Sequence, residues 1–143
     1  NFARPGHRAV HNEAVWRGGH YAGLGPGAHG FRPSGERTIG PPNLQQWLED
    51  PNPDVTRPTR HEHAMDRILS TLRHSQGLDL NALRTESGLT IEDQTLRALT
   101  ATGSLRLVDA HLQLTPEAYP IADGIVRRLI EGLTSIGESS VST

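Results

Sequence analysis

Apolar residues recur every three or four positions along most of the second part of the chain. This spacing places them on one face of a helix, and it predicts helices over about 61–74, 80–87, 91–102 and 116–133. Pro116 suits the first position of the last helix, whereas Pro120 removes a backbone donor and predicts a kink or a restart there. The second part therefore has the pattern of a packed, mainly helical domain.

Local signals define the ends of these helices. Asp79 is placed to cap the second helix, and Gly88 is placed to end it in a left-handed conformation. Thr90 followed by Asp93 resembles a capping box, although such a box prefers Glu or Gln at its second position. We therefore expect the third helix to open at this pair and to end at Gly103.

A different periodicity lies between the third and the last helix. Leu105 and Leu107 alternate with polar residues, as do Leu112 and Leu114, and the two runs flank residues 109–111. This pattern predicts a two-stranded hairpin. The order helix, helix, helix, hairpin, helix is that of a winged helix. The expected fold is mainly α with a small β-hairpin, a winged-helix-like domain over 59–137 and a flexible tail over 138–143.

Residues 1–58 carry nine of the fifteen glycines and eight of the ten prolines, a density of helix and strand breakers that disfavours an independent core. Short elements are still expected here: a helix over 12–17 that ends at Gly18 and Gly19, and a strand over 21–24. Asn43 is a good cap for a further helix that carries Leu44, Trp47 and Leu48 on one face. Residues 50–58 are interpreted as a linker.

Composition narrows the chemistry. The 143 residues contain no cysteine, which excludes disulfides, thiolate zinc sites and iron–sulfur ligands within them. No run approaches the about 20 apolar residues of a membrane span. The opening residues do not resemble a signal peptide.

Charge disfavours the DNA binding that a winged helix first suggests. Residues 59–143 carry eight arginines against eleven acidic residues, and Glu92 and Asp93 stand where the third helix would meet phosphates. We expect this domain to serve packing or protein contact, with no nucleic-acid partner.

Four histidines, His7, His11, His20 and His29, fall within 23 residues of the first part, together with Trp16. Imidazole is a common ligand of heme iron, and an indole ring can pack on a porphyrin. The alternative, which the spacing alone favours, is that these are polar loop residues, since no tight metal-ligand spacing is present.

The glycines of the same region do not form a nucleotide site. Gly23, Gly25 and Gly27 fail the dinucleotide pattern because Ala28 stands at the next required glycine, and no apolar helix follows. They are better explained by a close approach of the backbone to a neighbouring strand or to a ligand.

The segments NFARPGH, HNEAVW and YAGLGPGAHG resemble the end of the catalytic domain of HemW-type heme chaperones. These are radical SAM proteins related to HemN, the oxygen-independent coproporphyrinogen III oxidase. The later segments GLDLNAL and LQLTPEAYPIADGIVRRL are similar to the HemN C-terminal domain. The resemblance implies that the chain is about the last third of such a protein. Residues 1–58 would then be the tail end of the radical SAM barrel plus a linker, and 59–137 the C-terminal domain that packs over the barrel mouth.

The resemblance also implies site residues. The family motif His-Asn-x-x-Tyr-Trp, proposed to bind heme, is matched by His11, Asn12 and Trp16, with Val15 in place of the tyrosine. His11 is then the candidate ligand of the heme iron. Gly25, Gly27 and His29 would lie near the S-adenosylmethionine pocket of the parent, and Gly30 stands where the family often has serine. The four-iron four-sulfur cluster and S-adenosylmethionine belong to the parent, because its three-cysteine motif is absent here.

Three functions are carried forward. The first is a fragment of a cytoplasmic heme chaperone that delivers heme to hemoproteins of the respiratory chain, and that meets a membrane surface only through those partners. The second is a fragment of a coproporphyrinogen III oxidase of porphyrin biosynthesis. The third is a winged-helix protein-interaction module. In none of them does this chain alone act as a radical SAM enzyme, because it has no cluster ligands.

Overall fold

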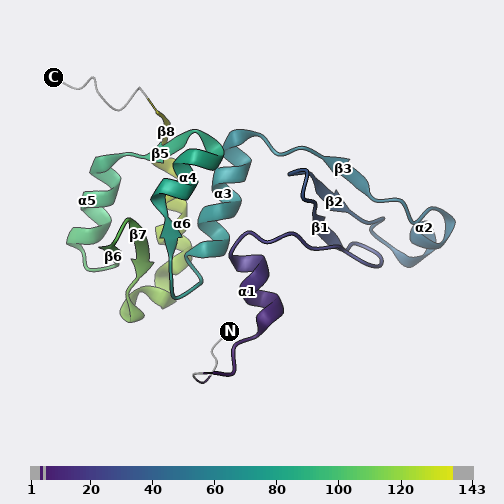
Figure 1. The fold of residues 1–143 in the computed structure, drawn as a ribbon, viewed down its shortest axis with the longest axis horizontal. Helices are drawn as coiled ribbons and strands as arrows, with labels where there is room; N and C mark the ends of the chain where they lie inside the picture. The colour runs from purple at the N-terminus through teal and green to yellow at the C-terminus, as the bar shows by residue number, and fades with distance from the viewer. Residues whose placement is uncertain (1–3, 5, 137–143) are drawn as a thin grey trace. The chain divides into compact units, whose positions relative to one another are not determined.

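The computed structural model describes residue 4 and residues 6–136. The chain divides into two compact units, Asn1–Thr59 and Arg60–Thr143, and each is described by itself. The flexible tail expected over 138–143 lies outside the described residues. Figure 1 shows the elements of both units along the chain.

The second unit contains the predicted helices. One side chain from each α-helix forms the centre of the core: Ile68, Leu83, Leu99 and Leu129 are each at most 1% exposed. Burying such side chains stabilises a fold by about 1.5–3 kcal/mol each. In chain order the helices are α3 (Arg60–Thr71), α4 (Leu80–Ser87), α5 (Asp93–Ala101), the 3-10 helix η1 (Pro116–Ile121) and α6 (Ala122–Glu131).

Helix α4 is bounded as the sequence predicts. The Asp79 carboxylate accepts hydrogen bonds from the backbone N–H groups of Asn81 at 2.8 Å and Ala82 at 3.0 Å. At the other end Gly88 adopts a φ of 70°, and its N–H donates to the Arg84 carbonyl. Of the kink and the restart predicted at Pro120, the structure shows the restart. The 3-10 helix η1 contains Pro120, and α6 begins two residues later.

The predicted hairpin is present and larger than expected. Strands β6 (Leu105–Val108) and β7 (His111–Leu114) pair antiparallel, and β4 (Leu78–Asp79) adds to the other side of β7. The turn has two residues, since His111 already belongs to β7. The elements thus follow the predicted order, while the winged-helix arrangement itself stays a prediction.

Two expectations near the third helix are wrong. Thr90 lies in strand β5 (Leu89–Ile91), and α5 follows Glu92 without a side-chain cap, so no capping box forms. Leu133 lies in β8 (Leu133–Ser135), which pairs antiparallel with β5, and not on the last helix. Pairing between strands this far apart in sequence overrides the local helical pattern that the apolar spacing indicates.

The first unit is built around a small antiparallel sheet in the order β1 (His29–Phe31), β2 (Arg37–Ile39), β3 (Asp54–Thr56). The predicted strand over 21–24 is wrong, since Tyr21 makes only an isolated bridge to Phe31. The predicted linker over 50–58 is also wrong in part, because β3 lies within it. The described residues therefore combine helices with three small antiparallel sheets, and are not mainly α with one hairpin.

Two helices complete the first unit, α1 (Val10–Trp16) and α2 (Leu44–Glu49). Asn43 caps α2 as predicted, with its side-chain oxygen accepting from the Gln46 N–H at 3.0 Å. Neither helix has a buried residue. The buried residues among the described part of this unit are Gly30, Thr38 and Gly40, so it has no apolar core of its own.

Glycines allow the segments of the first unit to pack closely. A Cβ at Gly40 would lie 2.6 Å from the Gly25 carbonyl oxygen, and one at Gly30 would collide with the Thr38 hydroxyl. The Gly40 N–H in turn donates to the Ala28 carbonyl at 2.9 Å. Of the glycines for which a close backbone approach was expected, Gly23 confirms it, since a Cβ there would collide with the His29 carbonyl, whereas Gly25 and Gly27 have no such close neighbour.

Candidate functional site

Helix α1 carries the residues predicted to bind heme. His11 is exposed, whereas Asn12 and Trp16 are half-buried. The helix predicted over 12–17 is confirmed, with bounds shifted toward the N-terminus.

Helical geometry places four of its side chains on two adjacent stripes. Residues four apart lie one above the other, so His11 stands over Val15, and Asn12 stands over Trp16 on the adjacent stripe. Successive residues differ by about 100° around a helix, so the imidazole shares its stripe with Val15, while Asn12 and Trp16 face a different direction. The Glu13 carboxylate receives the Arg8 guanidinium at 2.9 Å.

Two glycines end α1 sharply. The N–H of Gly18 donates to the Val15 carbonyl at 2.9 Å and that of Gly19 donates to the Ala14 carbonyl at 2.8 Å. Gly18 has a φ of 78°, and this pair of bonds is the Schellman ending of a helix. A Cβ at Gly19 would lie 2.6 Å from the Ala14 oxygen, so a side chain there would disrupt the ending. The glycine pair fixes where α1 stops, directly after Trp16.

This arrangement suits heme better than a free metal ion. Among the described residues no group of three or more His, Cys, Asp or Glu side chains is placed to hold a metal. Heme brings four of its own iron ligands and needs one exposed axial donor beside apolar and aromatic surface. His11 offers the donor, with Val15 on its own stripe and the Trp16 indole on the adjacent one.

The glycines assigned to the S-adenosylmethionine region form a turn. Gly25 and Gly27 have φ values of 103° and 65°, and the Gly27 N–H donates to the Pro41 carbonyl at 2.7 Å. Their backbone conformation alone requires glycine at both positions. His29 follows at the start of β1 and is exposed. Their role toward S-adenosylmethionine stays a prediction.

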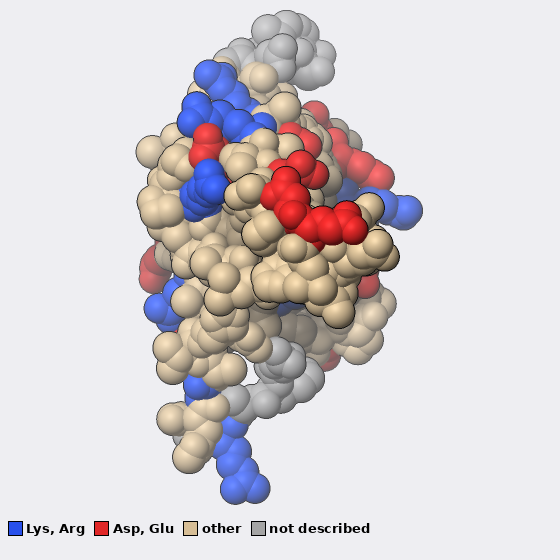
Figure 2. All heavy atoms as spheres, turned by 90° about the vertical axis from the view of Figure 1, so that its right-hand side faces the viewer, with Lys and Arg blue, Asp and Glu red and all other residues tan. Residues whose placement is uncertain are grey.

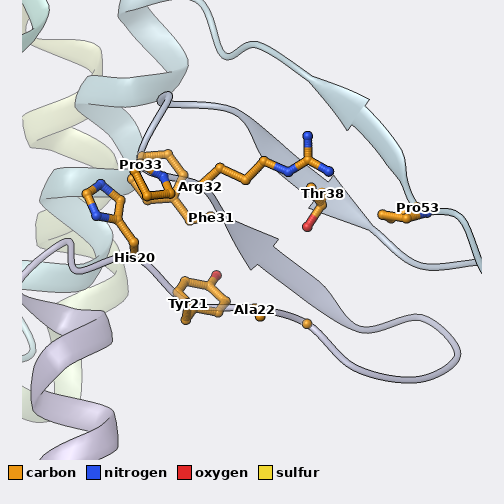
Figure 3. Close-up of a pocket in the computed structure, with 9 residues that line it drawn as sticks. His20, Tyr21, Ala22, Phe31, Arg32, Pro33, Thr38 and Pro53 are labelled. Carbon is orange, nitrogen blue, oxygen red and sulfur yellow. The ribbon is translucent and has the colours of Figure 1, made fainter.

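The sequence missed one feature of this unit, an open hollow of about 410 Å³. Figure 3 shows that its lining comes from segments well separated in sequence, including His20 and Tyr21, Phe31 to Pro33, Thr38 and Pro53. His20 packs against Phe31 with ring centroids 5.6 Å apart. The sequence does show aromatic residues beside Arg32, which could have indicated a binding surface. Nothing in the sequence indicates that the segments lining the hollow meet.

Two histidines of the second unit, His63 and His74, have structural contacts. His63 and Arg67 both reach the Glu86 carboxylate, at 3.4 and 2.9 Å, which joins α3 to α4. His74 is 7% exposed, and its Nδ1 accepts the Gln76 N–H at 3.1 Å. These contacts explain both residues without a ligand.

Charges of both signs occupy the surface. Figure 2 shows arginine side chains and acidic side chains exposed on the face that it presents. At the start of α5, Asp93 pairs with Arg97 at 3.9 Å. Within the described residues no helix is long and apolar enough to cross a membrane.

Comparison with known proteins supports the resemblance. Residues 59–121 match the family model of the HemN C-terminal domain. The chain is 29% identical over 145 aligned residues to the heme chaperone HemW of Mycobacterium tuberculosis, covering 91% of this chain and 33% of that protein. It is 38% identical over 95 residues to the mitochondrial radical S-adenosyl methionine domain-containing protein 1 of Danio rerio, covering 63% of this chain and 21% of that protein.

The chain thus spans about a third of the HemW relatives and about a fifth of the Danio rerio protein. No solved structure matches the chain. The resemblance to the HemW and HemN proteins is confirmed, and it includes a match of residues 59–121 to the model of the HemN C-terminal domain.

Proposed function

We propose that this chain is part of a heme chaperone of the HemW type, and that α1 holds heme as cargo through His11. The observation that carries the proposal is the exposed imidazole of His11 on a helix that presents Val15 on the same stripe and the half-buried Asn12 and Trp16 on the adjacent one. The similarity to HemW along 91% of the chain supports it.

Each of the three motif residues has a separate task in this proposal. His11 supplies the axial nitrogen to the heme iron, and Trp16 packs against the porphyrin. Asn12, a neighbour of both on the helix, donates its amide N–H to a propionate or to the imidazole. An exposed site of this kind suits transfer, because a cargo that is only partly enclosed can pass to an acceptor with higher affinity.

The wider setting is proposed on the same basis. Recipient hemoproteins of the respiratory chain are the expected acceptors in the cytoplasm, and the radical SAM barrel is the expected neighbour of the first unit. No nucleic-acid partner is included, because Glu92 and Asp93 lie at the start of α5 and would repel phosphates. Membrane-surface contact would come only through the recipients. S-adenosylmethionine and the iron–sulfur cluster supply radical chemistry to proteins of this group, but these 143 residues hold no cysteine to bind the cluster.

Titration with hemin tests the proposal. The full chain is titrated with hemin, and the Soret band is followed for the unaltered chain and for His11→Ala. We expect an imidazole-ligated Soret band in the first case, and at least a tenfold loss of affinity with the band of unligated hemin in the second.

The matched control is His7→Ala, which removes an exposed imidazole four residues upstream and outside α1. It should bind hemin as the unaltered chain does. Identical Soret spectra and affinities for His11→Ala and the unaltered chain would remove His11 from the role and contradict the proposal.

A further inference from the structure

The hollow of the first unit offers a second kind of contact for a planar, negatively charged ligand. Its volume of about 410 Å³ falls in the range of roughly 300–1,000 Å³ that small-molecule sites occupy. It is widely open to solvent, so it admits one edge of a ligand larger than itself. The lining combines aromatic and proline surface with one cationic side chain.

One wall of the hollow is aromatic. His20 and Phe31 lie with their ring planes tilted by 31°, and Pro33 is drawn beside them in Figure 3. The bridge between Tyr21 and Phe31, with hydrogen bonds of 2.9 and 2.8 Å in both directions, fixes this wall to β1. Flat aromatic surfaces of this kind stack on planar conjugated rings.

Arg32 provides the positive charge, and its backbone is held in place. The Arg32 N–H donates to the Glu36 carbonyl at 2.9 Å, and the Gly35 N–H donates to the Arg32 carbonyl at 2.9 Å. With Gly35 at a φ of 81°, these bonds close a tight hairpin loop between β1 and β2. Arg32 therefore projects from a fixed point at the edge of the hollow, as Figure 3 shows.

The guanidinium of Arg32 can donate further hydrogen bonds to a ligand. Among the described residues its ion pair is to the Glu36 carboxylate at 3.6 Å, longer than a hydrogen bond, and that carboxylate already accepts from the Ser34 hydroxyl at 2.8 Å. The Arg32 side chain is 47% exposed. A guanidinium has five N–H donors in a planar fork that matches a carboxylate.

We propose that this hollow binds one carboxylate-bearing edge of a tetrapyrrole, with Arg32 on the propionate and Phe31 and His20 against the ring. The inference rests on the proposed function, since it takes heme as the cargo. It adds a contact that needs no metal, separate from the axial ligand on α1. A metal-free porphyrin should therefore bind here as well.

The test uses the full chain and protoporphyrin IX, with its dimethyl ester as the uncharged comparison, followed by porphyrin fluorescence. We expect Arg32→Gln to weaken the binding of the free acid by about tenfold, which corresponds to the loss of one charge-assisted hydrogen bond. The same substitution should leave the binding of the ester unchanged. Arg57→Gln, an exposed arginine of the first unit outside the hollow, is the matched control and should alter neither.

A second variant strengthens the test. Glu36→Gln removes the carboxylate that competes for Arg32, so it should tighten binding of the free acid and not of the ester. Equal binding of acid and ester, with no effect of Arg32→Gln on either, would overturn the inference.

The two proposals fail separately. If His11→Ala abolishes the ligated Soret band while protoporphyrin IX does not bind, the function stands and the hollow is not a tetrapyrrole site. If Arg32→Gln weakens protoporphyrin IX while His11→Ala leaves the heme spectrum unaltered, the hollow stands and the role of His11 fails.

Discussion

Two residues of the hairpin turn between β6 and β7 adopt a left-handed backbone without being glycine. Asp109 has a φ of 47° and Ala110 a φ of 65°. A two-residue turn with both φ values positive matches the twist of a hairpin, and asparagine and glycine usually occupy it. Asp109 tolerates this conformation, whereas the Cβ of Ala110 makes it unfavourable.

We expect Ala110→Gly to stabilise the chain by about 0.5–1 kcal/mol. The substitution relieves the left-handed strain, and this gain exceeds the loss that comes from the greater conformational entropy of glycine in the unfolded chain. The Ala110 carbonyl accepts from the Leu80 N–H at 3.0 Å, a backbone bond that the substitution keeps. Urea unfolding followed by circular dichroism measures the change.

The opposite substitution is the control. Gly103 has a φ of 71° with open space around its missing Cβ, so Gly103→Ala should destabilise by about 1 kcal/mol through the backbone alone. A loss of stability on Ala110→Gly would show that the turn does not hold this conformation.

At the scale of elements, the sequence predicted most caps and stops, the capping box at Thr90 and Asp93 being the exception. Asn43, Asp79, Gly88 and the pair Gly18 and Gly19 act through their own local hydrogen bonds, which depend little on the rest of the fold. The placement of Asn12 and Trp16 on one helix follows from the same local signals, whereas His11 lies on it only because α1 begins two residues earlier than predicted. These parts could therefore be predicted from neighbouring residues.

The short strands could not be predicted. The strands β1, β2, β3, β5 and β8 have three residues each, too few to show an alternating pattern. Their pairing depends on distant partners, as for Thr90 with Thr134. The hollow was missed for the same reason, since Tyr21, Phe31, Thr38 and Pro53 meet only once the sheet has formed.

Removal of the α4 cap measures how much such a local interaction contributes to the stability of the chain. Asp79→Ala loses both hydrogen bonds to the helix N-terminus and should lower the free energy of unfolding by about 1 kcal/mol. Glu92→Ala, at the equivalent position before α5, removes no capping bond and should change stability by far less. Equal effects of the two substitutions in thermal unfolding would contradict the assigned cap.

At the scale of the molecule, the two units differ in what holds them together. The buried apolar side chains of the described residues all lie in the second unit, and the first relies on backbone pairing and close glycine contacts. This difference agrees with the composition, since the first part carries most of the glycine and proline. We expect the first unit to be the less stable of the two.

Two spectroscopic probes can follow the unfolding of the two units separately. Both tryptophans, Trp16 and Trp47, lie in the first unit, whereas the longest helices lie in the second. Tryptophan fluorescence should therefore change at lower urea concentration than far-UV circular dichroism does. Coincident curves would mean that the chain unfolds as one cooperative body and would contradict this expectation.

The central claim is that the His11 imidazole binds heme iron, and chemical rescue tests it most directly. The Soret spectrum of hemin with His11→Ala is recorded before and after addition of free imidazole, beside the unaltered chain. We predict that His11→Ala loses the imidazole-ligated band, and that free imidazole restores the band and the retention of heme by the chain. A ligated band that survives in His11→Ala without imidazole would contradict the claim.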